Sequence, residues 1–136
     1  MPENGMIRLI KPSDLEKIAA LESQLFYKGL DLASLQTLFA GPSFKGFVYG
    51  KSPSAYLLAH VTQEDAEILS IGTVPAQQRQ GMAGALCQHL VTLLSAARKT
   101  ALFLEVAADN DAAISLYQKN GFLQIATRKA YYRRQV

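Results

Sequence analysis

Glu105 is the residue that most needs an explanation, because it interrupts an apolar run. The stretch from 101 to 107 reads ALFLEVA, so one carboxylate stands among alanine, leucine, phenylalanine and valine. An ionised carboxylate is costly to bury unless it is paired or hydrogen-bonded. If the run is a strand, Glu105 shares a face with Phe103 and not with Leu104, because successive side chains point to opposite faces. Either that face borders water, or the carboxylate takes part in chemistry.

A second candidate site is the stretch from 78 to 84, QRQGMAG, which leads from an apolar run into a helical pattern. Small residues at a helix start leave its first N–H groups open to a ligand, and the helix dipole favours an anion there. The stretch lacks the Gly-Lys-Ser/Thr ending of a P-loop and the spacing of a dinucleotide fingerprint. It is either a pyrophosphate cradle or an ordinary helix start softened by glycine.

The composition is typical of a globular domain that needs no disulfides or metals. Of the 136 residues, 49% are hydrophobic and 18% charged, and we expect one domain over residues 1–136. No apolar run approaches the roughly 20 residues that span a bilayer, and the N-terminus does not resemble a signal peptide. A single cysteine, Cys87, fits a reducing compartment, and the two histidines lie far apart. We therefore expect a cytoplasmic protein without a metal site.

The net charge is a mild +3, but basic residues crowd into the last nine positions around Tyr131 and Tyr132. A solvated basic tail is one interpretation of this cluster. A binding site for phosphate, an acidic peptide or RNA is another. Charge alone does not decide between them.

Hydrophobic spacing predicts a mixed sheet covered by helices. The first helix starts with a capping box from Ser13 to Glu16, and its apolar face is interrupted by Glu22. A second short helix ends at Gly41. Short links then indicate an antiparallel meander, which leads into a strand-helix-strand-helix-strand unit, so the fold class is α/β. The expected strands are 6–10, 44–50, 55–62, 66–74, 101–107 and 122–132, and the later helices are 81–98 and 110–119.

The helix start at Gln78, Gly81 and Ala83 has the pattern Q-x-x-G-x-A, which resembles the acyl-coenzyme A motif of the GCN5-related N-acetyltransferase (GNAT) superfamily. Downstream, the chain resembles the pattern L-E-V-R-x-x-N-x-x-A-x-x-L-Y-x-x-x-G-F of the RimI-type ribosomal-protein alanine acetyltransferases. The matching positions are Leu104, Glu105, Val106, Asn110, Ala113, Leu116, Tyr117, Gly121 and Phe122. The resemblance covers residues 66–132, about half of the chain, and implies the GNAT fold.

The resemblance implies transfer of an acetyl group from acetyl-coenzyme A to an amine. It makes Glu105 the general base and Tyr117 the general acid, and it places Tyr131 and Tyr132 against the acceptor peptide. The residues that it assigns to acetyl-coenzyme A are Ile71, Gly72, Thr73, Arg79, Gln80, Gly81, Met82, Ala83, Gly84 and Asn110. In this assignment 71–73 line the pantetheine arm, 79–84 hold the pyrophosphate, and Asn110 lies near the thioester.

The chemistry of acyl transfer agrees with these roles. An α-amino group has a pKa of about 8, so at neutral pH most of it must lose a proton before attack. A carboxylate at a strand end can take this proton directly or through one water. Tyr117 follows Glu105 across one tight turn, and a phenol that donates to the sulfur helps the thiolate of coenzyme A to leave. The charge on the carbonyl oxygen would need a backbone N–H, which the strand at 71–74 could supply.

Two departures from the family pattern concern the acceptor and the end of the sheet. RimI-type enzymes have an aromatic-proline-tryptophan segment after the first helix, whereas this chain reads QLFYKGLDL there and has no tryptophan. The family also continues beyond the paired tyrosines into one more strand. This sequence ends at Val136, so we expect that final strand to be missing. The strand at 122–132 would then have an open edge, which basic residues or a second copy of the chain could protect.

The resemblance thus favours an acetyl-coenzyme A-dependent acetyltransferase that acts on the N-terminal α-amine of a protein, with a ribosomal protein as one candidate acceptor. It requires neither nucleic acid nor a membrane, and the protein would be a monomer or an edge-paired dimer. One alternative is an acetyltransferase for a small amine or a lysine side chain. Another is a non-catalytic acyl-coenzyme A-binding module that regulates a partner, although intact Glu105 and Tyr117 speak against it.

Overall fold

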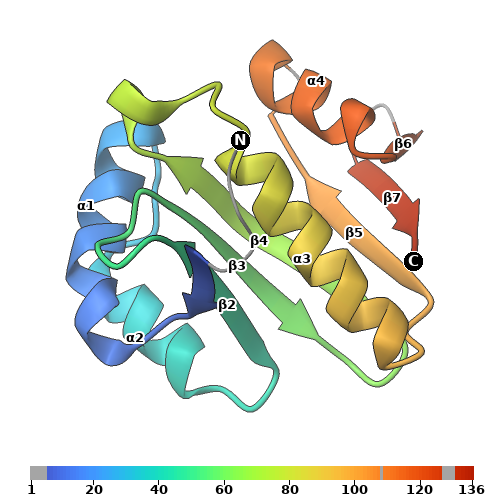
Figure 1. Ribbon diagram of the computed structural model, residues 1–136, viewed down its shortest axis with the longest axis horizontal. Helices are drawn as coiled ribbons and strands as arrows, with labels where there is room; N and C mark the ends of the chain where they lie inside the picture. Colours follow the sequence, from blue (N-terminus) through green and yellow to red (C-terminus); the bar gives the residue numbers. More distant parts are fainter. Residues whose placement is uncertain (1–5, 108, 127–130) are drawn as a thin grey trace.

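Seven strands form one mixed sheet in residues 6–107, 109–126 and 131–136, which the computed structural model describes (Figure 1). The strands are β1 (Ile7–Leu9), β2 (Phe44–Tyr49), β3 (Ala55–Val61), β4 (Ala66–Thr73), β5 (Ala101–Glu105), β6 (Leu123–Ala126) and β7 (Tyr131–Gln135). The helices are α1 (Leu15–Leu25), α2 (Leu32–Ala40), α3 (Met82–Ala96) and α4 (Asp111–Lys119), with 3-10 turns at η2 (Pro12–Asp14) and η3 (Pro75–Gln77). The strand order is β1-β2-β3-β4-β5-β7-β6.

The sheet separates two apolar clusters, with α1 and α2 on one face and α3 and α4 on the other (Figure 1). In β3, Tyr56 and Leu58 belong to the cluster under α1 and α2, whereas Leu57 belongs to the cluster under α3 and α4. This alternation follows from the two-residue period of a strand. The centre of the sheet is therefore buried on both faces and gives the rest of the fold a rigid support.

Strands β4 and β5 are a parallel pair that separates along its length. They pair only from Ala66 with Leu102 to Ile68 with Leu104. Beyond this point β4 continues to Thr73, whereas β5 ends at Glu105. The register of β4 with β3 also shifts here by one extra residue, and such a bulge increases the local twist. The last part of β4 therefore presents an edge that β5 does not cover.

The predicted mixed sheet is confirmed, including the antiparallel meander from β2 to β4 and the crossover through α3. Parallel neighbours need such a crossover, because the chain must return to the same end of the sheet. In the part of the chain that the structure describes, no helix is long and apolar enough to cross a membrane.

The prediction of a single last strand at 122–132 is wrong. The segment contains β6 and the start of β7, which pair with each other in antiparallel fashion. Strand β7 lies between β5 and β6, so the final strand that the sequence analysis expects to be missing is present. The tyrosine pair begins this strand and does not precede it. At this end of the sheet the edge strand is β6, in which Leu123 and Ile125 are 73% and 51% exposed.

The start of α1 is held differently from the predicted capping box of Ser13 and Glu16. The buried carboxylate of Asp14 accepts a hydrogen bond from the backbone N–H of Lys11 (2.7 Å) and two from the guanidinium of Arg8 (2.8 and 2.9 Å). These bonds, first of all the two from Arg8, hold the pKa of the Asp14 carboxyl below its usual value. Because Arg8 lies in β1, this ion pair fixes the start of α1 to the edge of the sheet.

Candidate functional site

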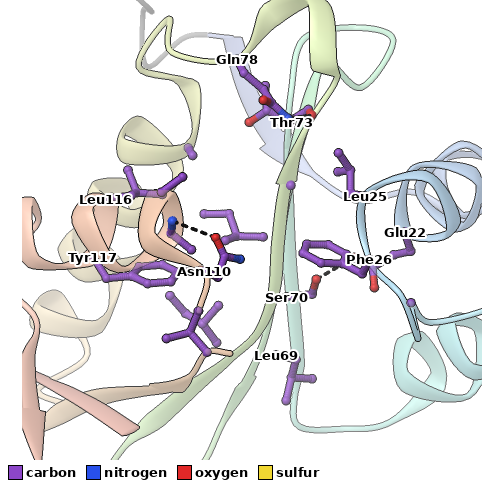
Figure 2. Close-up of a pocket in the computed structure, with 18 of the residues that line it drawn as sticks. Glu22, Leu25, Phe26, Leu69, Ser70, Thr73, Gln78, Asn110, Leu116 and Tyr117 are labelled. Carbon is purple, nitrogen blue, oxygen red and sulfur yellow. Dashed lines mark hydrogen bonds between the residues drawn. The ribbon is translucent and has the colours of Figure 1, made fainter. Parts of the chain in front are cut away.

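A cleft of about 890 Å³ opens where β4 and β5 separate (Figure 2). The uncovered edge of β4 runs between the two sides of this cleft, as Figure 2 shows. The α1–α2 side is lined by Glu22, Phe26, Lys28, Gly29, Leu30 and Leu38. The α3–α4 side is lined by Arg79, residues 81–84, Asn110 and Tyr117. Residues 105–107, at the end of β5, also line the cleft.

The loop before α3 has an unusual backbone at Arg79 and Gly81. Their φ angles are 65° and 85°, and Gly81 is the N-cap of the helix. A non-glycine residue in this left-handed region is uncommon, and such residues concentrate at ligand clamps. The Gln78 side chain donates a hydrogen bond to the carbonyl of Thr73 (3.3 Å) and ties the loop to the end of β4. The first N–H groups of α3 lack intrahelical acceptors and border the cleft, so this helix start can hold an anion.

The uncovered edge of β4 includes Ile71, Gly72 and Thr73, all three of which line the cleft. On the other edge they pair with β3 in regular antiparallel fashion. Backbone N–H and C=O groups along an uncovered edge can pair with an extended ligand as they would with a strand. This edge is therefore suited to an elongated molecule that carries amide groups.

Glu105 is the last residue of β5, and its exposed side chain lines the cleft. Its neighbour on the same face, Phe103, is half-buried, and its ring stacks on that of Tyr131 with 5.7 Å between the centroids. Tyr131 lies opposite Glu105 in the register with β7. The face that carries the carboxylate thus borders the cleft and water, which explains why the charge is tolerated in an apolar run.

Tyr117 reaches the cleft from α4, although the residue is only 5% exposed. Its ring packs edge-on against Phe122, with 5.6 Å between the centroids. Burial, with a smaller effect of Cys87, raises the pKa of the phenol well above its usual value. Within the described ranges the Tyr117 hydroxyl has no hydrogen-bond partner. Every fully buried side-chain oxygen in those ranges has one, so this hydroxyl is not fully buried. The hydroxyl is therefore a protonated donor that is open to the cleft.

Asn110 links the cleft to the start of α4. Its side-chain oxygen accepts a hydrogen bond from the backbone N–H of Ala113 (3.2 Å) and so caps the helix that carries Tyr117 (Figure 2). This leaves the amide NH2 as the group that could donate to a ligand. The residue is thus part of the helix cap and part of the cleft wall.

Three residues of the predicted site are not among those that line the cleft, namely Gln80, Tyr131 and Tyr132. Gln80 is exposed beside it. Tyr131 is half-buried on the same sheet face as Glu105, and burial, followed by the charges of Glu67 and Glu105, raises the pKa of its phenol. Tyr132 packs in the core under α3 and α4 and is 2% exposed. The structure therefore separates the tyrosine pair: Tyr132 packs into the core, whereas Tyr131 shares a sheet face with Glu105.

The structure adds Glu22, whose role the sequence does not reveal. This residue of α1 is 2% exposed and lines the cleft. Its carboxylate accepts hydrogen bonds from the Ser70 hydroxyl (2.6 Å), the Leu30 backbone N–H (3.0 Å) and the Tyr56 hydroxyl. Burial, followed by the bond to Glu22, raises the pKa of the Tyr56 phenol. The signal in the sequence was a glutamate on an otherwise apolar helix face.

In the described residues no cluster of histidine, cysteine, aspartate and glutamate could hold a metal ion. The cleft thus offers a helix start for an anion, a strand edge for an extended chain, an exposed carboxylate and a protonated phenol. Together these groups can bind a long phosphorylated donor and move protons at one end of it.

Comparisons with known proteins point in the same direction. The model of the Acetyltransferase (GNAT) family matches residues 14–122. The [Ribosomal protein bS18]-alanine N-acetyltransferase of Escherichia coli K12 is 38% identical over 79 residues, which are 58% of this chain and 53% of that protein. This match spans about half the length of the relative. The N-alpha-acetyltransferase RimI of Mycobacterium tuberculosis H37Rv is 32% identical over 130 residues, which are 89% of this chain and 80% of that protein.

The fold agrees with solved structures as well. The crystal structure of the ribosomal-protein-S18-alanine N-acetyltransferase from Escherichia coli superposes with a TM-score of 0.84 and 24% identity, covering 96% of this chain and 92% of that one. That likeness concerns the fold alone. Since the family model matches most of the sequence, and a relative that is 32% identical covers 89% of this chain, the chain belongs to the GNAT acetyltransferase family.

Proposed function

We propose that this protein transfers the acetyl group of acetyl-coenzyme A to the N-terminal α-amine of a protein. The observation that carries the proposal is that Glu105 and Tyr117, from β5 and α4, line one cleft beside the uncovered edge of β4. The names of the relatives from Escherichia coli and Mycobacterium tuberculosis support an α-amine acceptor, with a ribosomal protein as a candidate. A cytoplasmic location, expected from the single cysteine, belongs to the same proposal.

The α3–α4 side of the cleft is the proposed binding site of acetyl-coenzyme A. Its pyrophosphate would take the N–H groups at the start of α3, at residues 81–84, with Arg79 beside them. The amides of the pantetheine arm would pair with the edge of β4 from Ile71 to Thr73. When bound, the molecule supplies an acyl group activated as a thioester.

The proposed mechanism is direct transfer. Glu105 removes a proton from the acceptor ammonium, and the neutral amine attacks the thioester carbon, so that a C–N bond forms and the C–S bond breaks. A backbone N–H of the β4 edge stabilises the charge on the carbonyl oxygen. As the amide forms, the nitrogen gives up its second proton. The Tyr117 hydroxyl protonates the departing sulfur and is restored by that proton, so that coenzyme A leaves as the thiol. Both side chains line the cleft, where these steps would occur.

The helix-start site is tested by Gly81→Val, which places a branched side chain at a left-handed N-cap beside the cleft. We expect acetyl-coenzyme A to raise the melting temperature of the wild type but not of this variant. The matched control is Gly50→Val, which has the same kind of backbone strain (φ 94°) in a turn away from the cleft. The control should melt earlier yet keep the ligand-induced rise in melting temperature, which reflects a stabilisation of about 2.7 kcal/mol at a hundredfold excess of ligand over Kd. Equal shifts in both variants would contradict the assignment.

The base is tested by Glu105→Gln. We expect kcat/KM to fall by about 10²–10⁴-fold at pH 7, the usual contribution of a general base. The loss should be smaller at about pH 10, because an α-amine with a pKa of about 8 is already neutral there. Glu67→Gln is the control, since Glu67 lies beside Phe103 on the same sheet face but does not line the cleft. A pH-independent loss in Glu105→Gln would assign proton removal elsewhere.

The acid is tested by Tyr117→Phe. Turnover should fall by about 10²-fold or more, while the affinity for acetyl-coenzyme A stays near the wild-type value. Because burial raises the pKa of Tyr117, the phenol keeps its proton beyond its usual value of about 10. The wild-type rate should therefore not decline between about pH 8 and pH 10. If the wild-type rate declines in that range and the rate of Tyr117→Phe does not, this protonation state is contradicted. Tyr49→Phe, in β2, is the control for the loss of a hydroxyl from a buried tyrosine.

The acceptor class is tested with peptides that carry one free α-amine and one free lysine, analysed by mass spectrometry after incubation with acetyl-coenzyme A. We expect acetylation of the α-amine, with a small first residue such as alanine or serine preferred. The α-amine loses its proton about two pH units more easily than lysine does. Acetyl groups found only on lysine would overturn the N-terminal proposal and favour a lysine or small-amine acetyltransferase.

A further inference from the structure

We propose that Glu22 is a positioning residue for the acceptor: its carboxylate holds the segment 26–31 in place and so fixes the α1–α2 side of the cleft. The inference rests on the proposed function: with acetyl-coenzyme A on the α3–α4 side, the α1–α2 side, which lies across β4 from it (Figure 2), is the part of the cleft left for the acceptor. That segment supplies Phe26, Lys28, Gly29 and Leu30 to the cleft wall.

The carboxylate joins three separate parts of the chain to α1. One oxygen accepts the hydrogen bond of the Leu30 backbone N–H (3.0 Å). The other accepts those of the Tyr56 hydroxyl from β3 and the Ser70 hydroxyl from β4. A carboxylate that is 2% exposed requires such donors, since an unpaired buried charge is strongly destabilising. The bonds therefore specify where each partner lies relative to α1.

The segment after α1 also packs directly on the main chain of Glu22. The helix ends where the Phe26 N–H donates to the Glu22 carbonyl oxygen (3.0 Å). A Cβ at Gly29 would overlap that same carbonyl oxygen. Main-chain packing at Gly29 and the side-chain bond to Leu30 thus hold the segment at two neighbouring points. The contact at Gly29 is with the main chain of residue 22, and the bond to Leu30 requires its carboxylate.

The hydrogen bonds of the Glu22 carboxylate distinguish this role from that of a general base. Both oxygens of Glu22 already accept hydrogen bonds, whereas Glu105 is exposed at the cleft. Ser70 directly follows the point where the register of β4 shifts, so its bond to Glu22 also supports the uncovered strand edge. We infer that Glu22 shapes the cleft through its partners and does not exchange a proton with the acceptor.

The kinetic test compares Glu22→Ala, Glu22→Gln and Glu16→Ala. Glu22→Ala should raise the KM for an acceptor peptide at least tenfold, while the KM for acetyl-coenzyme A changes less than twofold. Glu22→Gln should keep the acceptor KM near the wild-type value. Its amide oxygen can still accept from Leu30, and the hydroxyl groups of Tyr56 and Ser70 can rotate to accept from its NH2. Glu16 is an exposed glutamate of the same helix, and its variant should match the wild type. A fall in kcat at unchanged acceptor KM would overturn the proposal, because a partly unfolded sample behaves in that way.

Hydrogen exchange gives a readout that does not need turnover. The Leu30 amide should exchange at least tenfold faster in Glu22→Ala than in the wild type, while amides in β3 keep their protection. Unchanged protection of Leu30 would overturn the positioning role even if the acetyltransferase activity is found. If no amine is acetylated by the wild type, the proposed function fails, and this exchange experiment still decides whether Glu22 holds the segment.

Gly29→Ala keeps the proposal testable if Glu22→Ala does not fold. The added Cβ displaces the segment from the Glu22 main chain and leaves the carboxylate intact. We expect the same selective rise in acceptor KM as for Glu22→Ala. Wild-type acceptor KM in a folded Gly29→Ala protein would overturn the proposal.

Discussion

The site depends on one constraint, the early separation of the only parallel strand pair among the described residues, β4 and β5. A parallel pair requires a crossover, and here α3 starts beside the end of β4, close to the point where the strands part. The end of β5 brings Glu105 to the same opening, and the turn into α4 brings Tyr117. The carboxyl ends of parallel strands are the general place for ligands in sheets with helices on both faces. The anion site, strand edge, base and acid thus have a common geometric origin.

Pairs of identical residue types show how the surroundings decide what a side chain can do. Glu22 and Glu105 both border the cleft, but the first is buried and accepts three hydrogen bonds while the second is exposed. Tyr56 and Tyr117 are both buried phenols with raised pKa values. The Tyr56 hydroxyl is committed to a carboxylate, whereas that of Tyr117 opens into the cleft. In each pair one member supports the architecture and the other is available for chemistry.

Local patterns predicted the meander, the start of α3 and the exceptional position of Glu105, because each follows from residue spacing and turn residues over a short stretch. The division into β6 and β7 was missed because residues 127–130, TRKA, contain none of the usual turn residues. Local patterns could not predict the hydrogen-bond partners of Glu22, since Tyr56 and Ser70 are 34 and 48 positions away in sequence. Which of two adjacent tyrosines faces the core depends on the register of β7 with β5, and no local signal gives that register.

The place of β7 in the sheet has a consequence for the order in which the protein can mature. Strand β5, which ends with Glu105, has β4 along part of one edge and β7 along the other, and β7 follows the other described strands of this sheet in the chain. A domain generally folds as a unit, and this requires its strands to have emerged from the ribosome. Until β7 has emerged, β5 therefore lacks its neighbour on one side. The strand that carries the candidate base becomes an interior strand only when β7 has left the ribosome and paired with it, so synthesis itself delays completion of the site.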